Sequence, residues 1–174
     1  MISGEEEGRL TFTGAVADQP PGKYLVIDIG GGSTEFALGE VAQKDATPAI
    51  PSPESESLDI GCVRLGERYL QSDPYLPSEL EDAHKAVKLI LERQDFEVAR
   101  TIDAHADELP QLIGVAGTVT SLASIELGLD DYNPLLTQGH SLTRETICEI
   151  YSELIKLPLA ERQHITGMPP DGAE

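Results

Sequence analysis

The stretch "YLVIDIGGGSTEFALGE", Tyr24 to Glu40, decides the fold, because three consecutive glycines separate two segments that each have the pattern of a β-strand. The first segment is a continuous apolar run, and the second alternates apolar and polar residues, which is typical of a strand buried on one face. A hairpin with Gly30 to Gly32 at its bend is the simplest arrangement. The glycines either serve only to reach positive φ angles or let a ligand approach the backbone.

Polar groups around the bend favour a ligand. Asp28 precedes the glycines, and Ser33, Thr34 and Glu35 follow them. Consecutive N–H groups in a turn without Cβ atoms can hold an anion, and the two carboxylates would offer oxygens to Mg²⁺ or another divalent cation on a phosphate. The pattern is not the dinucleotide fingerprint GxGxxG, because Glu35 stands at the third glycine position, and GxxxxGK[ST] does not occur.

A second glycine segment, "GVAGTVTSL" from Gly114 to Leu122, reads as a short strand that runs directly into a helix. Thr118 or Thr120 is expected to cap this helix, and its N-terminus would attract an anion. Tight packing of strand on helix without any ligand is the alternative. Two junctions of this kind in one chain favour phosphate binding.

The other segments predict an α/β protein. Residues 9–16, "RLTFTGAV", alternate like a strand, residues 41–57 read as a surface loop, and "LDIGCVRLG" is a candidate fourth strand. Helices are predicted after Pro77, from Thr118 to near Gly128, and from Thr143 to before Pro158, with a last helical turn at residues 159–165. Strands joined by short turns form an antiparallel meander, which does not suit a purely parallel sheet.

The composition restricts the partners of this chain. Its 174 residues, 40% of them hydrophobic, suffice for one domain with a hydrophobic core. A formal charge of −19 argues against nucleic acid and anionic membranes, so a polyanion would need backbone N–H groups, a few Arg or Lys, or a cation. Without a long apolar run or signal peptide, a cytoplasmic location is expected. Cys62 and Cys148 lack a CxxC neighbour and are expected to be small buried residues.

Five blocks of the chain resemble successive blocks of the Ppx/GppA family of exopolyphosphatases and guanosine pentaphosphate phosphohydrolases. They are "ISGEEEGRL", "VIDIGGGSTEFALGE", "IGCVRLGERYL", "GVAGTVTSLASIELGL" and "GHSLTRETICEIYSELIKLPLAERQHITGMPPDGAE". The resemblance implies an α/β, ribonuclease H-like domain of the actin-like ATPase superfamily, with a mixed sheet begun by an antiparallel meander and flanking helices. Family members bind phosphate between two such domains.

The resemblance also implies a domain division. The first phosphate loop of the family, D-[IL]-G-S-N-[ST], is absent from these residues. We therefore expect residues 1–16 to be the end of a first domain or a hinge segment, and residues 17–174 to be the second domain. A C-terminal helical region found in many members is expected to be missing as well.

Roles carried over from the family fall on matching positions of this sequence. Glu7 matches the general base that activates the attacking water, and Asp28 and Glu35 match acidic positions that hold Mg²⁺ or orient the water. The implied phosphate contacts are Gly30, Gly31, Gly32, Ser33, Thr34, Gly114, Ala116, Gly117 and Thr118. Arg64 and Arg68 are candidate basic contributors, with solvent-facing arginines as the alternative. His140 reads as a hydrogen-bonded structural histidine.

These expectations define a leading function and two alternatives. The leading function is Mg²⁺-dependent release of orthophosphate from the end of inorganic polyphosphate. Hydrolysis of guanosine pentaphosphate (pppGpp) and a non-catalytic phosphate or nucleotide sensor are the alternatives. The full-length protein is expected to be a homodimer, whereas residues 1–174 by themselves are expected to be inactive and prone to self-association.

Overall fold

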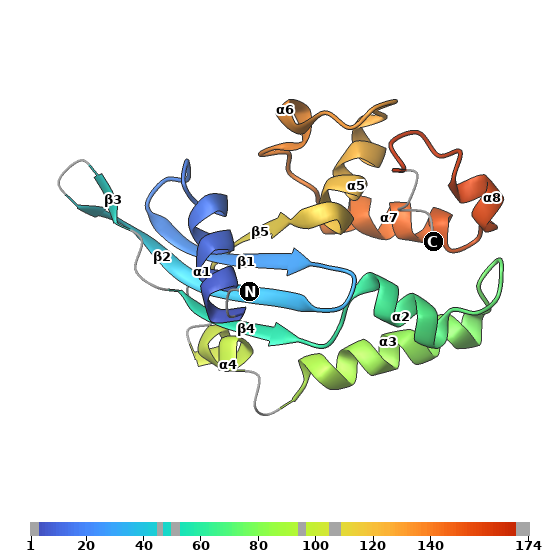
Figure 1. Cartoon of the computed structure of the whole chain (residues 1–174), viewed down its shortest axis with the longest axis horizontal. Coiled ribbons are helices and arrows are strands. Elements are labelled where there is room, and N and C mark those ends of the chain that lie inside the picture. Colours follow the sequence, from blue (N-terminus) through green and yellow to red (C-terminus); the bar gives the residue numbers. More distant parts are fainter. Residues whose placement is uncertain (1–3, 45–46, 50–52, 94–96, 105–108, 170–174) are drawn as a thin grey trace.

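The structure, a computed structural model, describes residues 4–44, 47–49, 53–93, 97–104 and 109–169 as a sheet flanked by helices (Figure 1). The elements, in chain order, are α1 (Gly4–Ala15), β1 (Gly22–Ile29), β2 (Thr34–Lys44), β3 (Thr47–Ala49), β4 (Glu54–Leu58), α2 (Cys62–Tyr69), α3 (Pro77–Leu91), α4 (Glu97–Ala104), β5 (Gln111–Val115), α5 (Ala116–Leu127), α6 (Pro134–Thr137), α7 (Arg144–Leu154) and α8 (Leu159–Arg162).

The sheet of the described residues is mixed, as predicted. Strand β1 pairs antiparallel with β2, and β2 pairs antiparallel with β3 and β4 along its other edge. Strand β5 lies parallel to β1 on the opposite side. The antiparallel meander is therefore confirmed, but it consists of β1, β2 and β4. Within it Asp28 lies directly opposite Glu35, and the predicted hairpin bend falls on residues 30–33.

Residues 9–15 form part of helix α1, so the strand predicted over residues 9–16 is wrong. Gly8, Phe12 and Val16 are buried at a spacing of four residues, which is the spacing of one helix face, and Leu10 is 49% exposed. The Phe12 ring lies against Gly39 of β2, where a Cβ atom would be only 2.6 Å from the ring. Packing of this face on the sheet outweighs the strand-like alternation of the threonines.

Residues 41–57 were expected to be a surface loop, yet their described part extends β2 and forms β3 and β4. Segment 58–66 was expected to return as a strand, but the strand ends at Leu58 and α2 begins at Cys62. The alternating "ESESL" of β4 pairs with residues 34–38 of β2. Glu and Ser have low strand propensity, so the cross-strand pairing decides this element.

The two faces of the sheet have separate cores. On one face Phe12 of α1 and Val16, just after the helix, form a cluster with Tyr24, Val26, Ala37 and Val41. On the other face Phe36, Leu58, Ile60 and Val98 pack with residues of α3 and α4. Figure 1 shows α1 across the sheet, and it places α2 with α3 and α5 with α7 and α8 beyond the end where β1 stops.

The predicted helices after β5 are confirmed, with one change in their caps. The Thr143 Oγ accepts a hydrogen bond from the Thr146 N–H and caps α7, and Gly128 ends α5 in a left-handed conformation. Val115, rather than Thr118 or Thr120, is the N-cap of α5. Cys62 and Cys148 are free and exposed, so the expectation that they are buried is wrong.

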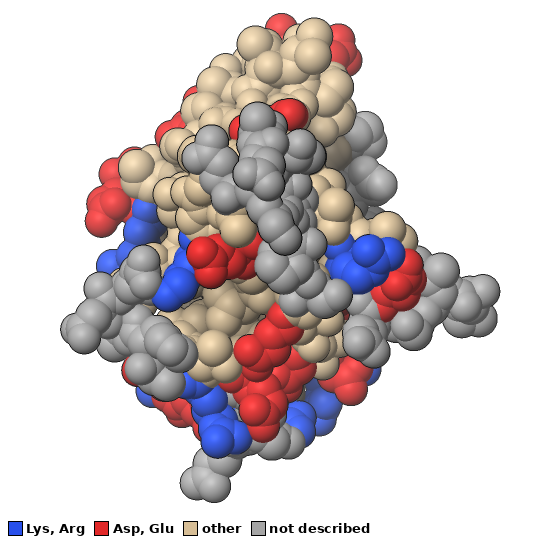
Figure 2. Space-filling view, turned by 90° about the vertical axis from the view of Figure 1, so that its left-hand side faces the viewer, with Lys and Arg blue, Asp and Glu red and all other residues tan. Residues whose placement is uncertain are grey.

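None of the helices in the described ranges is long and apolar enough to cross a lipid bilayer. Figure 2 looks onto the end of the molecule that carries β3, where Asp and Glu side chains are interspersed with Lys and Arg over the described surface.

Candidate functional site: an acidic cluster beside a glycine bend

Three strands and one helix bring the predicted acidic residues together. Asp28 has the same strand parity as Tyr24 and Val26, so it faces α1, and Glu35 lies opposite it on the same face. Ser57 of β4 pairs with Glu35, and its Oγ donates to Glu35 Oε1 at 2.8 Å. On α1, buried Gly8 lies close to Ser55 of β4, and Glu7 is the exposed residue before it.

The electrostatics of Asp28 show that this cluster is acidic. Partial burial raises the pKa of the Asp28 carboxyl, and the negative charges of Glu35 and Glu7 raise it further. Both glutamates therefore act on Asp28 across the α1 face of the sheet. Repulsion among neighbouring carboxylates favours a bound cation, which would remove the penalty on the charged forms.

We predict that Asp28→Asn makes the protein more stable at neutral pH. A carboxyl whose pKa is raised on folding takes up protons in the folded state, so stability falls as pH rises from the unfolded pKa through the folded one. Removing the charge should add roughly 0.5 kcal/mol after allowance for solvent screening. Thermal unfolding at neutral pH and at about pH 3 tests this, because the gain should vanish in acid. An equal gain at both pH values would contradict it.

The glycine bend is fixed by helix α2. The carbonyl of Gly30 accepts a hydrogen bond from the N–H of Cys62 at 3.0 Å, and that of Gly31 accepts one from the N–H of Arg64 at 3.0 Å. The carbonyl of Gly32 accepts a bond from Arg64 Nε at 2.7 Å. Three successive carbonyls therefore point toward the start of α2.

The N–H groups of the same three peptides must point the other way. In a planar trans peptide the carbonyl of one residue and the N–H of the next are antiparallel, so the N–H groups of Gly31, Gly32 and Ser33 face away from α2. Within the described part of the chain none of these three N–H groups has an acceptor. Adjacent donors of this kind can bind an anion.

Positive φ angles are not the reason for the glycines. Neither Gly30, Gly31 nor Gly32 has one, so the purely conformational interpretation of the bend is wrong. A Cβ atom on Gly31 would lie 3.1 Å from Val63 of α2, and one on Gly61 would lie 2.4 Å from the Gly31 carbonyl. Close approach of α2 to the bend therefore requires glycine at Gly61, whereas at Gly31 a Cβ atom would only press on the Val63 side chain. The Thr34 hydroxyl also connects the bend to the segment before α2, because it donates a hydrogen bond to the carbonyl of Ile60.

The second predicted junction lies beside the bend, because β5 is parallel to β1 and the Thr118 hydroxyl donates to the Ile29 carbonyl at 3.1 Å. Gly114 serves strand–helix packing, since its Cβ position would lie 2.8 Å from Val119. The Cβ position of Gly117 faces open space, so a ligand could approach there. Ala116 has φ 67, which is strained for a residue with a side chain.

We predict that Ala116→Gly stabilises the protein. The left-handed conformation costs alanine about 1–2 kcal/mol, and the added freedom of glycine in the unfolded chain offsets roughly half of this. A net gain of about 0.5 kcal/mol is expected in denaturant unfolding. Ala123→Gly, at a buried position inside the same helix, is the control and should destabilise by about 1 kcal/mol or more. A loss at Ala116 comparable with that at Ala123 would show that the turn is not strained.

A cation would depend on few protein ligands here. Among the described residues no group of three or more His, Cys, Asp or Glu side chains is arranged to hold a metal ion. Asp28 and Glu35, opposite each other on one face, remain as a pair. Such a pair suits Mg²⁺, which commonly takes one or two carboxylates, several waters and substrate phosphate.

The predicted basic residues and histidine have local partners. The Arg64 guanidinium lies 3.4 Å from Asp59 in addition to its bond to Gly32, and Arg68 lies over the Tyr69 ring at 5.4 Å. His140 is hydrogen-bonded to Glu126, as expected of a structural histidine.

Sequence reasoning missed Ser57 and Gly61. The sequence predicts a loop over residues 41–57, and this prediction leaves Ser57 out of the candidate site. The alternation of Glu and Ser in "ESESL" is the sequence feature that indicates a strand here. Pairing of this strand with β2 places Ser57 opposite Glu35. Gly61 carries no signal of its own, because its contact with the bend joins residues 30 positions apart.

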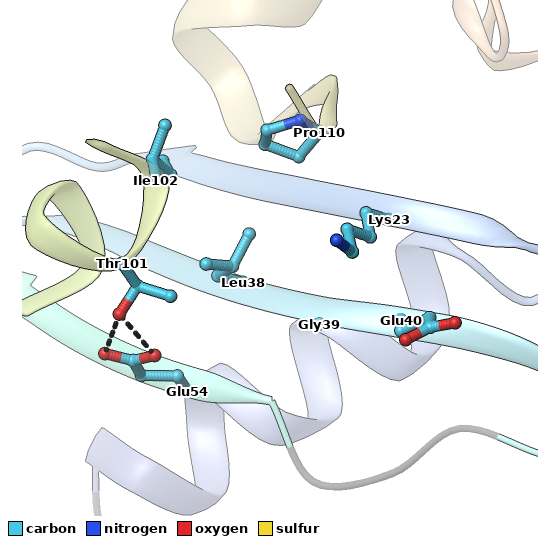
Figure 3. A pocket seen from close by; sticks show the side chains of 8 residues that line it. All are labelled: Lys23, Leu38, Gly39, Glu40, Glu54, Thr101, Ile102 and Pro110. Carbon is cyan, nitrogen blue, oxygen red and sulfur yellow. Dashed lines mark hydrogen bonds between the residues drawn. The ribbon is translucent and has the colours of Figure 1, made fainter. Parts of the chain in front are cut away.

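A pocket of about 250 Å³ lies at the other end of the sheet (Figure 3). Its lining consists of Lys23, Leu38, Gly39, Glu40, Glu54, Thr101, Ile102 and Pro110. Lys23 precedes Asp28 by five residues, so the pocket is roughly 17 Å from the acidic cluster along β1. It contains none of the predicted site residues, and the Thr101 hydroxyl already donates to Glu54 at 3.1 Å.

Comparisons with known proteins agree with the fold and the motifs. The chain is 33% identical over its whole length to exopolyphosphatase 2 of Mycobacterium tuberculosis, and it spans 50% of that protein. It is 30% identical over 97% of its length to a bifunctional 3-dehydroquinate synthase/phosphatase of Fusobacterium nucleatum, of which it spans 24%. The chain thus covers about half or less of the curated relatives it matches.

Solved structures show the same arrangement. A Ppx/GppA phosphatase of Aquifex aeolicus superposes with a TM-score of 0.74 at 26% identity, over 99% of this chain and 52% of that one. An exopolyphosphatase of Cytophaga hutchinsonii gives a TM-score of 0.73 at 27% identity, over 99% and 52%. The α/β fold with a mixed sheet, of the actin-like ATPase type, is therefore confirmed. Because the model of the Ppx/GppA phosphatase family matches residues 1–174, from the acidic run through both glycine junctions to the last helix, the chain belongs to that family.

Proposed function

We propose that this domain takes part in Mg²⁺-dependent hydrolysis of phosphoanhydride bonds, with the terminal bond of inorganic polyphosphate as its substrate. One observation carries the proposal: the charges of Glu7 and Glu35 both act on the Asp28 carboxyl, at the end of the sheet where three backbone N–H groups face away from α2. Anion donors and carboxylates side by side are what water attack on a phosphate needs.

Each group has a distinct role in this proposal. The N–H groups of Gly31, Gly32 and Ser33, with the open turn at Gly117, bind the terminal phosphate. Asp28 and Glu35 hold Mg²⁺, which would neutralise charge on the phosphate oxygens when bound. Glu7 accepts a proton from the attacking water, since it is exposed on α1 and close enough to raise the pKa of Asp28. Ser57 fixes one oxygen of Glu35.

Hydrolysis of guanosine pentaphosphate (pppGpp) is the second candidate. It requires the same water attack on a terminal phosphate, and the family is named for GppA as well as for Ppx. Glu7, Asp28 and Glu35 do not discriminate between the two substrates, because they act on the phosphate that both share. The preference for polyphosphate or pppGpp would depend on the residues that contact the part of the substrate beyond its terminal phosphate.

Orthophosphate release from polyphosphate and from pppGpp, measured side by side with and without Mg²⁺, tests this proposal. A family-length protein that contains residues 1–174 should release phosphate from polyphosphate faster and lose activity with EDTA. Faster release from pppGpp would favour the second candidate. Binding of either compound without any release would instead indicate a non-catalytic sensor.

Residues 1–174 tested alone should turn over substrate much more slowly than a family-length protein. The chain covers 50% of the mycobacterial relative, and we propose that residues 17–174 act opposite a second domain. Orientation of water against phosphate requires both walls of a site, and misplacement by about 1 Å can cost a hundredfold.

A further inference from the structure

We propose that Arg64 is a positioning residue that holds the glycine bend in its phosphate-binding form, acting through the backbone of Gly32 and not as a charge on the phosphate. This inference rests on the proposed function, since it assigns the cause of the geometry at that site. Its basis is the bonding of the bend to α2.

Residues of helix α2 donate hydrogen bonds to all three carbonyls of the bend. Two of them accept bonds from its first-turn N–H groups, at Cys62 and Arg64, which have no partner within the helix. The third carbonyl, that of Gly32, accepts a bond from the Arg64 side chain instead, from Nε at 2.7 Å. Among the residues that the structure describes, Arg64 alone donates to the bend from both its backbone and its side chain.

The bond to Gly32 fixes the orientation of the Ser33 N–H. Both belong to one planar peptide, so a carbonyl directed toward α2 turns the Ser33 N–H to the opposite side. Without the Arg64 side chain this peptide would lose the bond that α2 makes to its carbonyl and could rotate. The Ser33 N–H would then no longer face the same side of the bend as the N–H groups of Gly31 and Gly32.

The same geometry argues against direct phosphate contact by Arg64. Its guanidinium donates to a carbonyl and lies 3.4 Å from Asp59, on the side of the bend opposite to the N–H groups. The bend lies close to α2 because Gly61 has no side chain. The charge of Arg64 is therefore partly balanced by Asp59 and directed away from the proposed phosphate position.

Arg68 offers a matched comparison one turn along α2. It carries the same charge but lies over the Tyr69 ring at 5.4 Å and makes no bond to the bend among the described contacts. Arg64→Met and Arg68→Met each remove one charge and keep an aliphatic stem with good helix propensity. Arg64→Met loses the bond to Gly32 and the exposed ion pair with Asp59, whereas Arg68→Met loses only a contact with the Tyr69 ring among the described contacts, so only the first variant touches the bend.

The test uses ¹⁵N-labelled protein of residues 1–174 titrated with inorganic triphosphate in the presence of Mg²⁺, at about 50 mM and about 500 mM potassium chloride. Amide resonances of Gly31, Gly32 and Ser33 report both the free bend and its ligand. In free Arg64→Met protein the Gly32 and Ser33 amides should move from their wild-type positions, whereas in Arg68→Met they should not. Thermal unfolding checks that α2 remains folded.

Triphosphate should bind Arg64→Met roughly fivefold more weakly, by the same factor at both salt concentrations, and should bind Arg68→Met within about twofold of wild type. Three results would overturn the inference: wild-type affinity in Arg64→Met, a loss that disappears at high salt as expected of a direct charge contact, or unmoved Gly32 and Ser33 amides. If triphosphate leaves the wild-type bend unaffected, the proposed function fails, and the free-protein resonances still decide the role of Arg64.

Discussion

Gly61→Ala should destabilise this protein by about 3 kcal/mol and abolish phosphate binding at the glycine bend. The backbone at Gly61 has φ −142 and ψ 156, which alanine adopts freely, so only contacts oppose the substitution. The new Cβ would lie 2.4 Å from both the carbonyl carbon and the carbonyl oxygen of Gly31. It would also lie 2.6 Å from the carbonyl carbon of Gly32. Backbone cannot rotate aside as a side chain can, so α2 and the bend must separate at a cost typical of overpacking.

Denaturant unfolding and amide spectra of the bend measure this effect, and Gly66→Ala on the same helix is the control. Nothing lies within 4 Å of a Cβ atom at Gly66. Alanine there should stabilise α2 by roughly 0.5–1 kcal/mol, since glycine inside a helix is unfavourable. Equal effects of the two substitutions would show that the contact of α2 with the bend is not tight.

Glu7→Gln should lower phosphate release from polyphosphate by about a hundredfold or more and leave the fold intact. The amide is similar in size to the carboxylate but cannot accept the proton of an attacking water. Glu7 is exposed on α1, so its replacement removes no packing. It should also lower the pKa of Asp28 toward its ordinary value, because one of the negative charges that raise it is lost. Initial rates in a family-length protein that contains these residues provide the measurement.

The neighbouring residue supplies a close control. Glu6 pairs with Arg9 at 2.8 Å, and its charge does not contribute to the raised pKa of Asp28. Glu6→Gln should therefore remove an exposed ion pair, change stability little and leave phosphate release nearly unchanged. Should Glu6→Gln and Glu7→Gln reduce the rate alike, or should Glu7→Gln remain fully active, Glu7 would not be the base.

The sequence alone was sufficient for features governed by neighbours along the chain. The apolar run, the glycines and the alternation after them predicted the β1–β2 hairpin, and with it the pairing of Asp28 with Glu35. Thr143 and Gly128 marked helix ends through their own hydrogen bonds and backbone conformation. The family motifs added Glu7, whose acidic neighbours give no local reason to choose it.

Only the tertiary structure decided the features that depend on contacts between distant segments. Helix α1 replaced a predicted strand because its Phe12 face packs on the sheet, and β4 formed from a polar segment because β2 offered a partner. The direction of the N–H groups in the bend, the need for Gly61 and the contact of Arg64 with Gly32 all arise where α2 meets β1 and β2. Such contacts join residues about 30 positions apart, so no local pattern can encode them.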